Sequence, residues 1–163
     1  MVSVTNITEI RRLALDFREG IERAIDSGDI SPRTTKSTMP SFPRGCCDIA
    51  SDLLAEYLLQ NGIHTKSVHG EYDYDKWDNR FPHTWLETED GVIVDITADQ
   101  FAKERVFKAY SLTPCYVNTD RTFYYLFSED YREEEFRGLK NCDGEFYRQN
   151  IDPLYDIILS HIS

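Results

Sequence analysis

Positive charge is scarce in this 163-residue chain, which has 18 lysines and arginines against 29 aspartates and glutamates, a formal net charge of −11. An acidic surface repels phosphate groups, so we expect neither nucleic acid nor anionic membranes as partners. No apolar run approaches the ~20 residues that a membrane-spanning helix needs. Residues 1–12 lack the basic start, apolar centre and small-residue cleavage site of a secretory signal. A cytoplasmic protein is therefore expected.

Cysteines are also few, and two of the four, Cys46 and Cys47, are adjacent and poorly placed to bridge each other. Free thiols in a reducing compartment are the expectation. Adjacent cysteines are poor tetrahedral ligands, which disfavours a zinc site. Such a site would comprise Cys46, Cys47, His69 and His83. The chain also lacks a phosphate-cradling glycine loop, which disfavours an acyl donor that carries phosphates.

Apolar residues are plentiful, at 40% hydrophobic and 13% aromatic, which excludes a disordered chain. A chain of ~150 residues buries ~70% of its unfolded surface, enough for a core without disulfide or metal staples. We find no internal repeat and no linker, so residues 1–163 are expected to form one domain.

Apolar spacing of three and four predicts a helix over residues 6–26, with Asn6 and Glu9 as its capping box. Three prolines make residues 29–45 a long loop. A second helix is expected from the paired cysteines to Gln60. Asp152-Pro153 is expected to open a last helix.

Strands are expected over four short segments between these helices. They are residues 66–72, 83–87, 92–96 and 122–127. Asp90-Gly91, between the second and the third, is a strong hairpin signal. The remaining segments are an acidic, aromatic loop over 73–82, a short helix over 102–110 and a solvated helix or loop over 129–140.

A cysteine, a histidine and an aspartate in this chain indicate nucleophilic catalysis by a thiol. A thiol at a helix N-terminus, such as Cys47, is held near the positive end of the helix dipole, which lowers its pKa. Arg44 favours the thiolate in the same way. A turn at residues 90–91 brings positions 84 and 96 face to face, so His83 and Asp95 lie within about one register step. A thiolate needs such a histidine, and the histidine needs an acceptor.

Four short motifs occur in order along the chain. They are Gly45-Cys46-Cys47, Asn61-Gly62-Ile63, His83-Thr84-Trp85-Leu86-Glu87 and Asp95-Ile96-Thr97. This order resembles the transglutaminase-like branch of the papain-like cysteine protease superfamily, in which G-x-C opens a helix, Gly-Ile ends it, and an H-x-W-x-E strand precedes D-x-T. The G-x-C match and the spacing to Gly62-Ile63 select Cys47, not Cys46, as the nucleophile. The resemblance covers residues 42–101.

The resemblance implies an α+β, papain-like fold in which a cysteine-bearing helix packs on an antiparallel sheet, with an added N-terminal helix. It implies Cys47, His83 and Asp95 as a catalytic triad without a cofactor. The chain departs from the family where D-P-T reads Asp95-Ile96-Thr97 and where no glutamine precedes Cys47. Backbone N–H groups or the side chain of Gln100 are candidates for the missing oxyanion donor.

Two further residues are candidates for the substrate site. Arg44 precedes the cysteines, and Trp85 of H-x-W is expected either in the core or in the cleft. Acidic residues at 71, 73, 75 and 78 could favour basic or neutral substrates by charge, or form an ordinary solvated turn.

The implied function is cysteine-dependent acyl transfer on a carboxamide or peptide bond of a protein or peptide, as a hydrolase, deamidase or transamidase. One alternative is a non-catalytic peptide- or protein-binding module on the same fold. Another is an arylamine N-acetyltransferase-like enzyme, which the acidic charge disfavours because its donor carries phosphates. The sequence indicates no oligomeric state.

Overall fold

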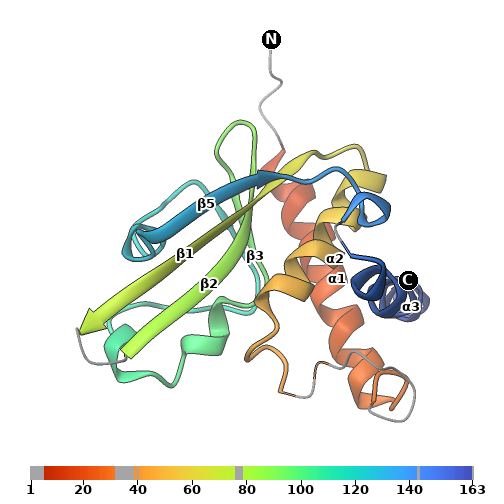
Figure 1. Cartoon of the computed structure of the whole chain (residues 1–163), viewed down its shortest axis with the longest axis horizontal. Coiled ribbons are helices and arrows are strands. Elements are labelled where there is room, and N and C mark those ends of the chain that lie inside the picture. Colours follow the sequence, from red (N-terminus) through yellow and green to blue (C-terminus); the bar gives the residue numbers. More distant parts are fainter. Residues whose placement is uncertain (1–5, 32–38, 40, 76–78, 143, 163) are drawn as a thin grey trace.

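The computed structural model describes residues 6–31, 39, 41–75, 79–142 and 144–162 (Figure 1). Within them, three α-helices lie beside a five-stranded antiparallel sheet, so the α+β class is confirmed. The helices are α1 (Ile7–Asp26), α2 (Cys47–Gln60) and α3 (Glu145–Ser160). The strands are β1 (Thr65–Asp75), β2 (Asn79–Thr88), β3 (Ile93–Asp95), β4 (Tyr116–Asn118) and β5 (Glu129–Glu135).

Helix α1 follows its sequence pattern closely. The Asn6 side chain accepts a hydrogen bond from the Glu9 backbone N–H, as the capping box predicts. Leu13, Phe17 and Ile21 lie on its buried face, spaced by three or four residues. The predicted helix over residues 6–26 is confirmed, and its apolar face packs on the other two helices and the sheet.

Helix α2 begins at Cys47, with Cys46 as its N-cap, and ends at Gln60 as expected. Its buried face includes Leu54 and Leu58, which join the core between the helices and the sheet. The helix contacts β2 and β1, so the cysteine-bearing helix packs on the sheet, as predicted.

The sheet has the strand order β4-β3-β2-β1-β5. Leu86 pairs with Val94 and Glu87 with Ile93, which is the register that the Asp90-Gly91 turn predicts. This pairing confirms the hairpin. No pairing joins β3 to the described part of β2 before Leu86, so the stretch of β2 that carries His83 is free on that edge.

Three expectations about the second half of the chain are wrong. Residues 122–127 form no strand, but a 3₁₀ turn over Tyr124–Leu126. Residues 129–135 form the edge strand β5, whose side chains are all exposed. Because both faces of β5 are solvated, it shows no apolar alternation. Helix α3 begins at Glu145, with Pro153 inside it, because burial of residues such as Leu154 and Ile158 outweighs one lost backbone hydrogen bond.

Smaller differences concern the loops. The segment 73–82 is largely strand, since β1 reaches Asp75 and β2 starts at Asn79. The helix expected over 102–110 is only a 3₁₀ turn, Arg105–Phe107. In the loop 29–45, residues 32–38 and 40 lie outside the described residues. No helix in the described part of the chain is long and apolar enough to cross a membrane.

A second core lies on the opposite face of the sheet from the helices. Alternation places Leu86 and Val94 in the first core, and Trp85 and Ile93 in the second. The second core is mostly aromatic and comprises Val68, Trp85, Ile93, Phe101, Phe107, Phe123, Tyr124 and Phe127. His83 shares this face with Trp85, so its ring is enclosed by aromatic side chains.

Gly70 makes room for this aromatic core. It pairs with His83 across the β1–β2 ladder, and a Cβ placed on it would lie 2.0 Å from the Phe127 carbonyl oxygen. Only a residue without a side chain lets the Phe127 backbone approach so closely. Phe127 can therefore pack 5.4 Å from the His83 ring, measured between ring centroids.

We predict that Gly70→Ala lowers the free energy of unfolding by ~1–3 kcal/mol, because the added methyl group displaces the Phe127 backbone. Urea denaturation measures the change. Ser67→Ala, on the same strand but not facing Phe127, is the matched control and should stay within ~0.5 kcal/mol of the original. Equal stability of the two variants would contradict the close approach.

Candidate active site

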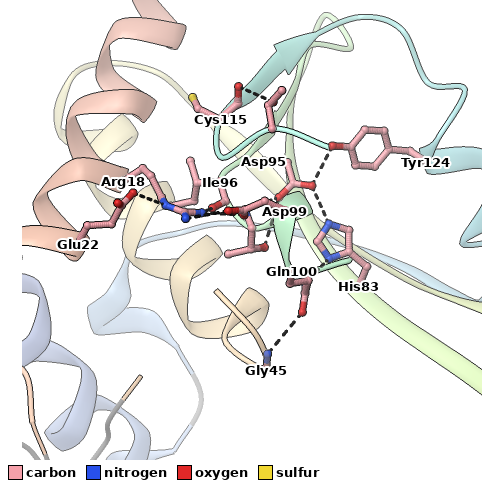
Figure 2. Close-up of polar contacts among 12 residues, drawn as sticks. Arg18, Glu22, Gly45, His83, Asp95, Ile96, Asp99, Gln100, Cys115 and Tyr124 are labelled. Carbon is pink, nitrogen blue, oxygen red and sulfur yellow. Dashed lines mark hydrogen bonds and ion pairs between the residues drawn. The ribbon is translucent and has the colours of Figure 1, made fainter. Parts of the chain in front are cut away.

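His83 and Asp95 form a hydrogen-bonded pair in the middle of the sheet (Figure 2). His83 lies on β2 and Asp95 ends β3, and the His83 Nε2 atom is 2.6 Å from Asp95 Oδ2. Their side chains are 0% and 1% exposed. The structure thus brings together two of the residues that the hairpin argument selects, in a region shielded from water.

Burial and charge oppose each other at this pair. Burial alone would lower the pKa of His83, but the charge of Asp95 and its hydrogen bond raise that pKa to about 9. Burial would raise the pKa of Asp95, but the charge and hydrogen bond of His83 hold it below its ordinary value. Both groups are therefore ionised near neutral pH, because each stabilises the charge of the other.

Asp95 has three other donors around it. The Tyr124 hydroxyl donates to Oδ2 at 2.8 Å, and the Thr97 backbone N–H donates to Oδ1 at 2.9 Å. The Thr97 hydroxyl is 3.4 Å from the same Oδ1. Together with His83, these donors satisfy both carboxylate oxygens, as a buried carboxylate requires.

Cys47 is the first residue of α2 and is half-buried. Its side chain adds a hydrogen bond and a Coulombic contribution to the raised pKa of His83. Because Nε2 of His83 faces Asp95, Nδ1 is the ring nitrogen left for the thiol. The structure therefore places the third predicted residue at the same histidine.

The other cysteines lie in different surroundings. Cys46 is 3% exposed, its thiol contacts the Arg44 carbonyl oxygen at 3.3 Å, and burial raises its pKa to about 11. Burial likewise raises the pKa of Cys115 to about 11. Cys46 thus packs in the core, where a thiol stays protonated.

Gln100 links the His83 ring to the chain before α2. Its amide Nε2 is 3.0 Å from His83 Nδ1, and its Oε1 accepts a 3.4 Å hydrogen bond from the Gly45 backbone N–H. Figure 2 shows the amide between these two groups. In this orientation Nδ1 is an acceptor, which suits a neutral His83. A protonated ring must instead donate from Nδ1, either to the Cys47 sulfur or to Gln100 Oε1 after the amide turns over.

Arg18 anchors the segment that carries Asp95 and Gln100. This α1 residue is 6% exposed and donates to the Ile96 carbonyl oxygen at 2.6 Å. It also donates to both Asp99 carboxylate oxygens, at 2.8 and 2.9 Å (Figure 2). A planar guanidinium can make all these bonds at once. The N-terminal helix therefore holds the end of β3 in position.

The remaining candidates lie at the edge of the site or outside it. Arg44 is exposed, and its described contact is through its backbone. Trp85 is 1% exposed and lies 5.6 Å from His83 between ring centroids, so it packs in the core and does not line a cleft. Glu71 and Asp73 pair with Arg80, while Asp78 lies outside the described residues.

A zinc site is not assembled in the described part of the chain, which contains no group of three or more histidine, cysteine or acidic side chains that could hold a metal. His69 points to the opposite face from His83, where it contacts Thr84. Searches against family models, curated proteins and solved structures find no match for this chain. The interpretation of the site therefore depends on its geometry.

Tyr124 and Arg18 are the contributors that sequence reasoning missed. Tyr124 lies 29 residues after Asp95, in a segment expected to be a strand. Arg18 lies in the middle of a helix, where the sequence suggests only a solvated charge. Neither carries a local signal, because each acquires its role through a tertiary contact.

We predict that Asp95→Asn lowers the pKa of His83 from about 9, because burial then acts without the charge of Asp95 to oppose it. NMR titration of the His83 ring measures this pKa.

The raised pKa of His83 also stabilises the folded state. This stabilisation is complete below about pH 6.5 and is lost as the pH rises towards 9. Between pH 6.5 and 8 the free energy of unfolding should therefore fall more steeply in the original protein than in Asp95→Asn. An equal slope in both would refute the ion pair.

We predict that Tyr124→Phe raises the pKa of Asp95, because the carboxylate loses a hydrogen bond that favours its charged form. A depressed carboxyl pKa contributes stability that is lost as the pH falls through it, so the acid-unfolding midpoint should move to higher pH. Circular dichroism during acid titration measures this midpoint. Tyr125→Phe, at a neighbour that is 71% exposed, is the control and should not move it. Equal midpoints for both variants would contradict the role of the hydroxyl.

Proposed function

We propose that this protein is a cysteine-dependent acyl-transfer enzyme with a papain-like fold, acting on a carboxamide or peptide bond of a protein or peptide. The observation that carries the proposal is the position of His83, with Asp95 on one ring nitrogen and the Cys47 side chain interacting with the same ring. A nucleophile, a base and an orienting acceptor are the three parts that thiol catalysis needs.

The first step is attack of the Cys47 sulfur on the substrate carbonyl carbon. Because His83 is ionised near neutral pH, its Nδ1 already holds the proton that the leaving nitrogen will need, and the new C–S bond gives a tetrahedral intermediate with a negative oxygen. Collapse of this intermediate breaks the C–N bond, and the His83 imidazolium returns the proton to the leaving nitrogen. The product is a thioester on Cys47, while Asp95 stabilises the imidazolium throughout.

The second step releases the acyl group. Water or an amine, deprotonated by His83, attacks the thioester carbonyl and restores the Cys47 thiol. Water on a peptide thioester completes proteolysis, water on a glutamine-derived thioester completes deamidation, and an amine completes transamidation.

The oxyanion of the intermediate needs donors near the Cys47 sulfur. The unpaired backbone N–H groups in the first turn of α2 are suited to this, since α2 begins at Cys47 itself. Gln100 is the second donor, because its amide already lies at His83 Nδ1. Its movement from the ring to the substrate oxygen would free Nδ1 to face the Cys47 sulfur.

One observation favours the non-catalytic binding module as a second candidate. The His83 side chain has no exposed surface, and Gln100 contacts the ring nitrogen that the thiol would use. A protein that never transfers a proton at His83 has no need to open this contact.

We predict that iodoacetamide labels Cys47 faster than Cys115 and Cys142, which serve as internal controls in the same chain. Because His83 activates the thiol, His83→Ala should slow the labelling of Cys47 by ~100-fold, the lower end of what a positioned base contributes. Peptide mass spectrometry measures each site. Equal labelling of the three cysteines, unchanged in His83→Ala, would contradict the enzyme.

Incubation with a cell lysate separates the possible outcomes. Cleavage, deamidation and cross-linking change the mass of a target protein differently, and each should require Cys47 when compared with Cys47→Ala. Full cellular activity of Cys47→Ser would instead support the binding module.

A further inference from the structure

The residues that follow Cys47 and His83 are also bonded to each other. The Thr84 hydroxyl donates to Asp48 Oδ1 at 2.5 Å, and Thr84 Oγ1 is also 2.9 Å from His69 Nδ1. Thr84 follows His83 in β2, and Asp48 follows Cys47 in α2. We call these three residues the Asp48–Thr84–His69 chain.

The protonation of this chain follows from its geometry. Thr84 has one hydroxyl proton, which the Asp48 carboxylate accepts, so Thr84 Oγ1 must accept from His69. The proton of a neutral His69 ring therefore lies on Nδ1. Both bonds are satisfied in this arrangement, and Thr84 is only 3% exposed, which strengthens its hydrogen bonds.

The chain lies on the opposite face of β2 from the reactive histidine. Successive strand residues point to opposite faces, so His83 points to the aromatic core and Thr84 to α2. The Ser51 hydroxyl, one turn further along α2, donates to the Thr84 carbonyl oxygen at 3.4 Å. The first turn of α2 is thus attached to β2 at the residue beside His83.

The N-cap Cys46 is buried in the first core and also holds this end of the helix, but from another side. The N-cap Cys46 makes no side-chain capping bond, and the Gly45–Gln100 contact is long, at 3.4 Å. On its outer side the chain borders an open cavity of about 570 Å³. Its lining includes Asp48, His69 and Thr84, so hydrogen bonds hold the helix start on this side.

We propose that the Asp48–Thr84–His69 chain positions Cys47 against His83, with Thr84 as its central positioning residue. The proposal rests on the proposed function, because it concerns the distance between nucleophile and base. Attachment at Thr84 fixes Asp48, and the helical backbone then fixes Cys47 one residue earlier. It also ties the Asp48 carboxylate to the face opposite His83, where its charge opposes the neighbouring thiolate less.

The test compares two equal substitutions on one strand. Thr84→Val removes the central hydroxyl with little change of shape. Thr88→Val is the matched control, because Thr88 is also 3% exposed and its hydroxyl also donates to a carboxylate at 2.5 Å, that of Asp90 in the hairpin turn. Both variants lose a similar hydrogen bond, but only Thr84 is attached to α2.

We expect Thr84→Val to slow iodoacetamide labelling of Cys47 by ~10- to 100-fold, since a misplacement of ~1 Å can cost 100-fold. Thr88→Val should leave this rate unchanged, and Thr84→Ser, which keeps the hydroxyl, should restore it. Equal rates in Thr84→Val and Thr88→Val, after thermal denaturation shows both folded, would overturn the proposal. If Thr84→Val does not fold, Thr84→Ala, which introduces no new group, takes its place with the same expected outcomes.

A second readout separates this proposal from the proposed function. Because the Cys47 side chain contributes to the raised pKa of His83, Thr84→Val should lower the NMR titration midpoint of His83, and Thr88→Val should not. An inert Cys47 in the original protein would refute the enzyme, whereas this shift would still support the positioning. An unchanged midpoint in Thr84→Val would refute the positioning.

Discussion

The buried ion pair of His83 and Asp95 is the interaction on which the site depends. Two charges shielded from water cost several kcal/mol each unless they pair closely and find other hydrogen bonds. The 2.6 Å contact, the Thr97 backbone and the Tyr124 hydroxyl supply both conditions. The result is a histidine whose charge is sustained well above its ordinary pKa, in a site that excludes water. A base that keeps its proton in this way is suited to stabilise a thiolate next to it.

The surrounding fold shields that pair from water and holds it in position. Aromatic rings enclose the His83 ring on the face away from the helices, and Gly70 lets the Phe127 backbone close against the sheet. On the other face, Arg18 of α1 holds the segment after β3 through the Ile96 carbonyl and the Asp99 carboxylate. Two of the helices thus take part in the site, since α1 anchors the segment after Asp95 and α2 carries the thiol.

Cys46 and Cys47 are adjacent in the chain but lie in different surroundings. Cys46 points into the core, where burial raises its pKa to about 11, and Cys47 interacts with His83. Cys46 is the N-cap and Cys47 the first helical residue, and their side chains leave the backbone in different directions. The amino-acid composition does not distinguish the two cysteines. The G-x-C spacing separates them in the sequence, and the direction of each side chain separates them in the structure.

The sequence by itself determined the features that local patterns control. They are α1 and α2 with their ends, and the 83–96 hairpin that brings His83 to Asp95, because helix periodicity and a tight turn need no distant partner. It did not determine β5, whose solvated residues become a strand only by pairing with β1, or α3, whose start depends on burial around Pro153. Tyr124, Arg18 and Thr84 likewise acquire their roles through contacts across the fold. Only the tertiary structure decided these elements and roles, since a hydrogen bond between residues far apart in the chain produces no regular spacing in the sequence.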